Sequence, residues 1–136
     1  MSDDCIFCSI AIGSAPARVV DENGGAVAFL DVNPAAPGHT LVIPRTHVRD
    51  IWDLGSEDSA AVWELTRMVA NSVRRSFEPD GLTLMQSNGE AAWQHVFHLH
   101  VHVVPRWRND GLQRPWAMIP GDPAELDLAL ARLKGG

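Results

Sequence analysis

The chain has 136 residues, enough for one domain with a buried hydrophobic core. Its formal net charge of −6 at pH 7 argues against a protein that binds nucleic acid non-specifically, because such a protein needs a basic surface. The sequence has no apolar leader segment and no run of about 18 apolar residues, so we expect no export, no membrane span and a cytoplasmic location.

The N-terminal half is predicted to hold one short helix and three strands. Asp3 and Asp4 can cap a helix from about Cys5 to Ile12. The Asn23-Gly24-Gly25 turn separates two apolar runs, which is typical of a β-hairpin. Two prolines and a glycine then mark residues 33–38 as a loop. We expect strands over residues 18–22, 26–31 and 39–43.

The C-terminal half is predicted to hold one long helix and two more strands. The helix begins at Ser56 and ends near Ser76, and its apolar stripe recurs every three or four residues. That stripe consists of Ala61, Leu65, Met68, Val69 and Val73. We expect strands over residues 82–87 and 97–104, an irregular stretch over 105–120 and a short helix from Asp122-Pro123.

Strands joined by hairpins, with few helices, predict an α+β fold on a five-stranded antiparallel sheet. No internal repeat divides the chain. We therefore expect a single domain over residues 1–136, with a core of about residues 5–106 and a tail over 107–136.

A row of histidines is the most informative feature of the sequence. Three of the six histidines, His98, His100 and His102, alternate with apolar residues. Strict alternation is typical of a strand, so residues 97–104 would carry three imidazoles on one face. Such a row is compatible with a zinc site, with nucleophilic and acid–base catalysis, or with a polar strand face whose groups are satisfied by their neighbours. The residues alone leave these alternatives open.

The segment His98-Leu99-His100-Val101-His102-Val103-Val104 resembles the signature of the histidine triad (HIT) family, in which three histidines alternate with apolar residues. Further segments resemble other family blocks and follow in the family's order. They are Cys5 to Ile10, Ala28 to Asp31, Pro37 to Pro44 and Asn88 to Ala92. The resemblance covers about residues 5–106, and with all its blocks it is very specific.

This resemblance implies a nucleotide hydrolase or nucleotidyl transferase that acts at the α-phosphate of a purine nucleotide. His100 matches the family nucleophile, which would form a nucleotidyl-histidine intermediate. His102 matches the group that donates hydrogen bonds to phosphate oxygens or to the leaving atom. His39 matches a supporting histidine, and with His98 these residues make up the catalytic set that the resemblance implies. Nucleoside phosphoramidase activity is the first expectation.

The resemblance also assigns residues to the substrate. Asp31 matches the residue that accepts hydrogen bonds from the ribose hydroxyls, although its spacing is equally compatible with an ordinary strand end. Asn88 and Gln94 match further donors to phosphate. The residues that match the base pocket are apolar, and periodicity alone would place them in the core. They are Ile6, Phe7, Ile10, Phe29 and Val32.

Cys5 and Cys8 favour metal binding or redox chemistry over a structural disulfide, because the chain shows no export signal. Zinc needs two further ligands, and no second closely spaced pair is present. In zinc-bearing members of the HIT family the ligands align with Cys5, Cys8, His47 and His98. We therefore expect a structural Zn²⁺ that pins the N-terminal helix to the sheet. Thiols packed in a helix are the alternative.

Two positions depart from the common family pattern. Trp93 stands where glycine usually precedes Gln94, and His95 stands where the phosphoramidase branch has serine. The departures keep two alternatives open, a dinucleoside polyphosphate hydrolase and a zinc-stabilised nucleotide-binding module with little turnover. Because family members are typically homodimers, we expect a homodimer, and we expect no nucleic-acid or membrane partner.

Overall fold

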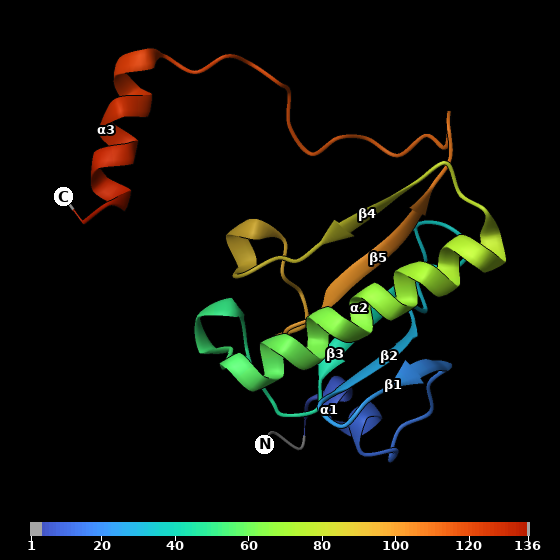
Figure 1. Cartoon of the computed structure of the whole chain (residues 1–136). Coiled ribbons are helices and arrows are strands. Elements are labelled where there is room, and N and C mark those ends of the chain that lie inside the picture. The colour runs from blue at the N-terminus through green and yellow to red at the C-terminus, as the bar shows by residue number, and fades with distance from the viewer. Residues whose placement is uncertain (1–3, 136) are drawn as a thin grey trace.

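The chain folds around a five-stranded antiparallel sheet (Figure 1), and the computed structural model describes residues 4–135. Hydrogen-bonded neighbours follow the order β1-β2-β3-β5-β4. The predicted α+β class and the five antiparallel strands are confirmed. The elements are α1 (Ile6–Ala11), β1 (Val19–Glu22), β2 (Ala26–Leu30), β3 (Thr40–Pro44), η1 (Ile51–Asp53), α2 (Ser56–Phe77), β4 (Gly81–Met85), η2 (Glu90–Ala92), β5 (Val101–Arg106) and α3 (Pro123–Leu133).

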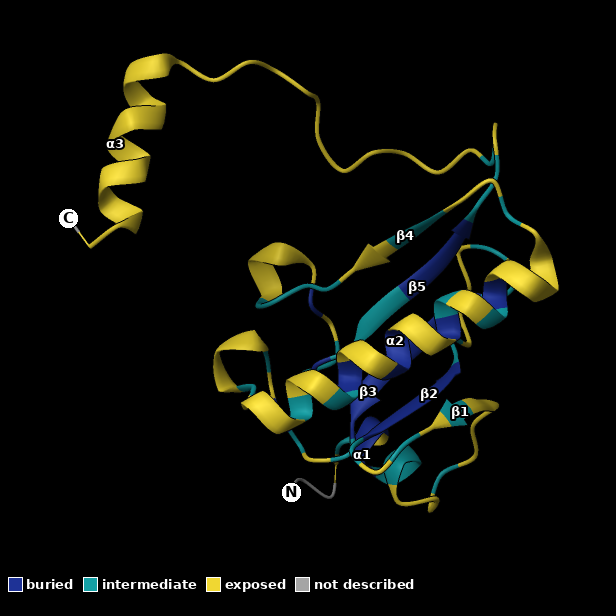
Figure 2. Ribbon diagram, in the orientation of Figure 1, coloured by how far each residue is buried: buried dark blue, intermediate teal, exposed yellow. Residues whose placement is uncertain are grey.

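The core lies on both faces of the central strands. Successive side chains of β2 point to opposite faces, as in any strand. Ala26 and Ala28 therefore pack beneath α2, whereas Val27 and Phe29 pack on the other face with Phe7 of α1. Figure 2 shows β2 and β3 as the buried centre of the sheet, with α2 along one face.

Helix α2 confirms the predicted long helix, with one correction to its apolar stripe. Leu65, Val69 and Val73 are buried as expected, but Met68 is 45% exposed. Val62 and Thr66 are buried instead, and Thr66 lies four residues after Val62 and three before Val69. The buried hydroxyl of Thr66 donates to the carbonyl of Val62 at 2.8 Å, so it has a partner inside the core.

The start of α1 also differs from the prediction. The capping residue is Cys5, whose Sγ accepts a hydrogen bond from the backbone N–H of Cys8 at 3.3 Å. Asp4 is therefore not the cap, and the predicted cap at Asp3 lies outside the described residues. This arrangement holds both sulfur atoms at one end of a short helix.

The fifth strand is displaced from its predicted position. We expected residues 97–104, but β5 covers Val101–Arg106, so only His102 of the histidine row lies in the regular strand. The chain bends at residues 96–98, and the N–H of Leu99 donates to the carbonyl of Val48 at 2.7 Å. The residues just before β5 are thus hydrogen-bonded to the segment that follows β3. The alternation of residue types in the sequence gives no sign of this contact.

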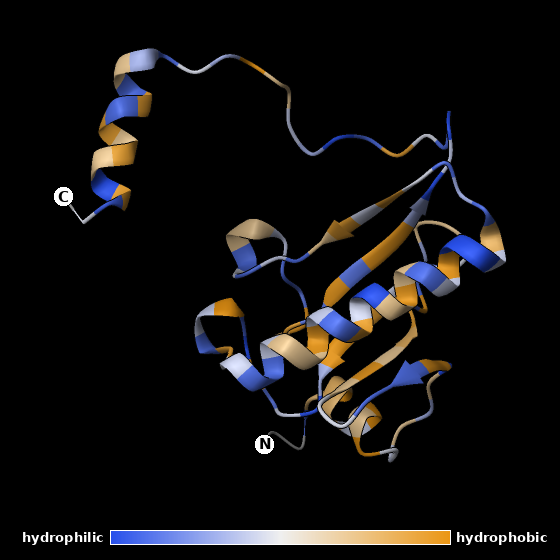
Figure 3. Cartoon of the chain, viewed as in Figure 1, coloured by the Kyte–Doolittle hydropathy of each residue, from blue (hydrophilic) through white to orange (hydrophobic). Residues whose placement is uncertain are grey.

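The tail leaves the sheet after β5, and its last helix stands apart from the rest of the chain (Figure 1). Asp122 caps α3 by accepting from the N–H of Glu125 at 3.2 Å, and Pro123 occupies the first turn, so the predicted terminal helix is confirmed. Every residue of α3 is exposed. Figure 3 nevertheless shows hydrophobic segments alternating with hydrophilic ones along α3. Leu126, Leu130 and Leu133 of this helix are exposed. Over residues 4–135 the structure has no helix long and apolar enough to cross a membrane.

Candidate functional site

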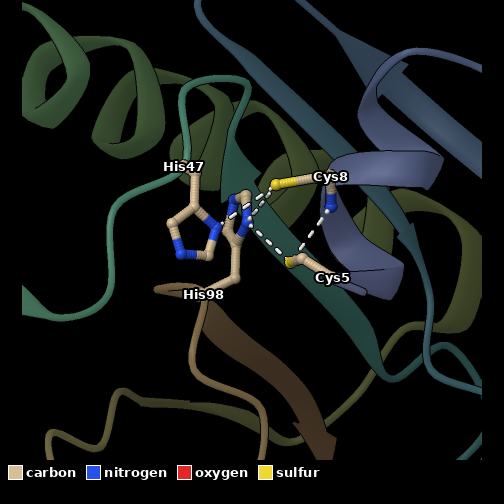
Figure 4. Close-up of side chains that lie close together, drawn as sticks. All are labelled: Cys5, Cys8, His47 and His98. Atoms are coloured by element: carbon tan, nitrogen blue, oxygen red, sulfur yellow. Dashed lines mark hydrogen bonds between the residues drawn. The ribbon is translucent and has the colours of Figure 1, made fainter. Parts of the chain in front are cut away.

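The predicted zinc ligands lie together on the face of the sheet opposite α2 (Figure 4). Cys5 and Cys8 come from the start of α1, His47 follows β3, and His98 precedes β5. The Sγ atom of Cys8 lies 3.2 Å from Nδ1 of His47 and 3.5 Å from Nδ1 of His98. The Sγ atom of Cys5 lies 3.4 Å from the same nitrogen of His98.

These distances fit a tetrahedral metal site. With Zn–S bonds near 2.3 Å and Zn–N bonds near 2.0 Å, sulfur and nitrogen ligands of one zinc ion stand about 3.5 Å apart. The four donor atoms also lie within 4.8 Å of one another. Two thiol sulfurs and two imidazole nitrogens form one of the usual ligand sets of structural zinc. The residues present therefore fit the ion that the sequence predicts.

His98 is held in the orientation that a metal ligand needs. Its Nε2 lies 2.8 Å from the carbonyl oxygen of Pro44. Because a carbonyl only accepts, Nε2 must carry the proton and Nδ1 must present its lone pair toward the two sulfurs. Burial lowers the pKa of His98, and a neutral imidazole is the form that binds a metal.

A second cluster contains Asp31, His39 and His102. Nε2 of His39 lies 2.9 Å from Nδ1 of His102 and 3.4 Å from Oδ2 of Asp31. On its other side, Nδ1 of His39 accepts the backbone N–H of Ala35 at 2.9 Å. The β3–β5 register, which pairs Leu41 with His102, brings these side chains together.

His100 lies between the two clusters. Its Nδ1 donates to the carbonyl oxygen of His98 at 2.8 Å, so its Nε2 carries the lone pair. The ring packs edge-on against Phe7, with centroids 5.2 Å apart, and lies 5.0 Å from the ring of His102. Burial lowers the pKa of His100. A neutral imidazole with an outward lone pair on one nitrogen is able to act as a nucleophile.

His102 is neutral across a wide range of pH. Burial, with the neighbouring His100 and His39, lowers the pKa of His102 to about 4. Burial also lowers the pKa of His39, partly offset by the nearby carboxylate of Asp31. Both rings therefore carry one proton each at neutral pH, and their hydrogen bonds decide on which nitrogen that proton sits.

The low pKa of His102 predicts a loss of stability in acid. An unfolded histidine binds a proton near pH 6.5, whereas folded His102 does so only near pH 4. Between these values the unfolded chain binds more protons, so the free energy of unfolding should fall as pH falls from 6.5 toward 4. Urea denaturation at pH 7, 6 and 5 measures this slope. His102→Gln should show a shallower slope, and an unchanged slope would contradict the assignment.

The residues that match the base pocket differ in how much of each side chain is exposed to solvent. Phe7 and Phe29 are buried and meet edge to face with ring centroids 5.4 Å apart, and Ile10 packs beside them. In contrast, Ile6 is 52% exposed and Val32 is 79% exposed. The first three side chains thus belong to the core that spacing alone predicts, and the last two leave apolar surface open to a ligand.

The side chains of Gln94 and Asn88 already make hydrogen bonds within the protein. The amide nitrogen of buried Gln94 donates to the carbonyls of Arg49 and Val96, at 2.7 and 3.1 Å, and its oxygen accepts from the N–H of Gly89 at 2.7 Å. Both of its N–H groups are therefore used. Asn88 Nδ2 donates to Gln86 and keeps a second N–H.

Sequence analysis missed two backbone groups that orient the histidines. The carbonyl of Pro44 fixes His98, and the N–H of Ala35 fixes His39. Neither residue carries a polar side chain, so residue type gives no signal for these roles. Only the fold brings the Ala35 N–H to a ring nitrogen.

Comparisons with known proteins identify the family of this chain. A family profile described as the HIT domain matches residues 13–109. The chain is 38% identical over 128 residues to the protein named Protein hit of Bacillus subtilis, covering 93% of this chain and 88% of that protein. It also resembles a zinc-bound histidine triad family protein of Mycobacterium smegmatis, at 38% identity, a TM-score of 0.76 and 96% coverage of both chains.

A second similar structure is a histidine triad nucleotide-binding protein of Candida albicans. It is 27% identical to this chain with a TM-score of 0.87, and the match covers 96% of this chain and 95% of that one. The family profile spans most of the chain, and the similarity extends over nearly its whole length. The chain therefore belongs to the HIT family.

Proposed function

We propose that the chain binds a purine nucleotide and releases a nucleoside monophosphate from it by hydrolysis or transfer at the α-phosphate. The observation that carries this proposal is the orientation of His100, whose Nδ1 is held by a backbone carbonyl while Nε2 presents its lone pair. Binding alone does not require such a nucleophile. The nucleotide-binding HIT protein of Candida albicans supports the choice of ligand.

In the proposed reaction, Nε2 of His100 attacks the α-phosphorus and the bond to the leaving group breaks. The N–H at Nε2 of His102, whose Nδ1 accepts from His39, donates a hydrogen bond to the leaving atom, which takes its proton from water. A water molecule then attacks the phosphorus and breaks the bond to Nε2 of His100, and the proton of that water passes to the solvent. Backbone N–H groups near Gly89 and the remaining N–H of Asn88 would stabilise charge on the phosphate oxygens.

Asp31 would bind the ribose hydroxyls, and the exposed apolar side chains of Ile6 and Val32 would contact the base. In this proposal Cys5, Cys8, His47 and His98 hold a structural zinc ion, which cross-links α1 to the approach of β5. His98 would then serve the chemistry through its carbonyl, which orients His100.

A side-by-side release assay tests the proposal. Adenosine 5′-phosphoramidate and a diadenosine polyphosphate are incubated separately with the full chain, and AMP is measured. We expect AMP from the phosphoramidate, with faster release than from the dinucleotide. Faster release from the dinucleotide would favour the polyphosphate hydrolase, and binding without release would favour the nucleotide-binding module.

We also propose that the chain is a homodimer. Helix α3 exposes Leu126, Leu130 and Leu133 at steps of three or four residues, as a helix does when another surface covers it. Edge strand β4 likewise exposes Leu84 and Met85. Sedimentation equilibrium should give twice the monomer mass at micromolar concentration, and a monomer there would contradict the proposal.

A further inference from the structure

His39 has one proton to share between two acceptors. Its Nδ1 accepts the N–H of Ala35, so in the neutral ring the only proton lies on Nε2. That nitrogen faces Nδ1 of His102 at 2.9 Å and Oδ2 of Asp31 at 3.4 Å. The His39 side chain is 6% exposed, so water has little access to this contact. The hydrogen bond runs to His102, and the Asp31 carboxylate is a second acceptor close to the same N–H.

The acceptor that takes this N–H decides the tautomer of His102. When His39 donates to Nδ1 of His102, that nitrogen must be unprotonated, and the proton of His102 lies on Nε2. When His39 donates to Asp31 instead, Nδ1 of His102 is no longer required to accept, and its proton is free to occupy either nitrogen. Only the first state fixes the proton of His102 on Nε2.

Asp31 has one oxygen available for a further ligand. Its Oδ1 accepts the N–H of Asn33 at 2.8 Å, which leaves Oδ2 as the oxygen that faces His39. A carboxylate oxygen offers about two acceptor sites. The two hydroxyls of one ribose would fill both of them, and His39 would then have His102 as its remaining acceptor.

We propose that the ribose hydroxyls of the bound nucleotide, by donating to Oδ2 of Asp31, direct the His39 N–H to His102 and so hold Nε2 of His102 as the hydrogen-bond donor to the leaving group. This inference rests on the proposed function and extends it to the class of substrate. The site selects ribonucleotides in the chemical step as well as in binding. Asp31 and His39 are positioning residues that act through His102.

Nitrogen-15 NMR of the histidine rings tests the relay without turnover. AMP and 2′,3′-dideoxy-AMP are added in turn to the ¹⁵N-labelled full chain, and the protonation of Nδ1 and Nε2 of His102 is measured. AMP should raise the population protonated on Nε2, and the dideoxy nucleotide at saturation should not. In Asp31→Asn, whose Oδ1 can still accept from Asn33 but whose amide cannot accept from His39, Nε2 should be protonated before any nucleotide is added.

Kinetics supply the second readout. For wild type, kcat with adenosine 5′-phosphoramidate should exceed kcat with its 2′,3′-dideoxy analogue by about fivefold, the scale of one hydrogen bond. In Asp31→Asn the two kcat values should be equal while KM rises.

If both nucleotides bind and give the same His102 tautomer in wild type, the proposed coupling from Asp31 through His39 to His102 is wrong and the proposed function stands. If neither nucleotide binds, both fail together. The wild-type comparison remains decisive even if the variant does not fold.

Discussion

His100→Ala should reduce AMP release by at least about a thousandfold, because the variant lacks the atom that forms the covalent intermediate. The His100 side chain is half-buried, and its ring packs edge-on against Phe7 and lies beside the ring of His102. Initial rates with adenosine 5′-phosphoramidate measure the loss. We expect the dissociation constant for AMP to change far less than the rate.

Two controls make that result specific. The zinc content of His100→Ala should equal that of wild type, because His98 keeps its bond to the Pro44 carbonyl. His102→Gln should retain more activity than His100→Ala, since a displaced hydrogen-bond donor slows the step without removing the nucleophile. Substantial turnover by His100→Ala would exclude a nucleotidyl-His100 intermediate.

Cys8→Ser should lower the melting temperature by more than about 10 °C, the largest stability effect that we expect of any single substitution here. Cys8 is 2% exposed, and its sulfur lies close to both His47 and His98. Losing the metal would remove the cross-link between α1, the segment after β3 and the approach of β5. The same substitution should reduce bound zinc, measured by elemental analysis, from about one ion per chain to a small fraction.

Ser9→Ala provides the matched control, because Ser9 follows Cys8 on the same short helix and is not a donor of the cluster. Its melting temperature and zinc content should stay close to those of wild type. Prolonged treatment of wild type with a strong chelator should reproduce the instability of Cys8→Ser. If Cys8→Ser and wild type contained equal zinc and melted together, the structural zinc site would be wrong.

The fold was largely predictable because local patterns agree with it. Prolines and glycines mark the turn at Asn23-Gly24-Gly25 and the loop before β3, and α2 has a clear three- and four-residue period. The predictions were wrong where contacts between distant parts of the chain determine burial or backbone conformation. Met68 matches the helical period only approximately, and the bend at residues 96–98 depends on the bond from Leu99 to Val48, which is distant in sequence.

The structure brings the predicted site histidines close together, but their hydrogen bonds could not be predicted. The family resemblance indicated His98, His100, His102 and His39, but neither the resemblance nor the spacing tells which ring nitrogen faces which neighbour. The tautomer of His39 depends on the N–H of Ala35, which the β3 loop brings to it. Gln94 is the opposite case. The family resemblance predicts that its amide donates to phosphate, but in the structure the amide nitrogen donates to the backbone carbonyls of Arg49 and Val96.

Trapping the intermediate tests the central claim most directly. Wild-type protein is mixed with excess adenosine 5′-phosphoramidate, quenched within the first turnover under conditions that preserve phosphoramidate bonds, and digested for mass spectrometry. We expect one adenylyl group on the peptide that contains His98, His100 and His102, with fragmentation placing it on His100, and none in His100→Ala. Rapid AMP release with no adenylyl group on that peptide, or an adduct that persists in His100→Ala, would contradict a nucleotidyl-His100 intermediate.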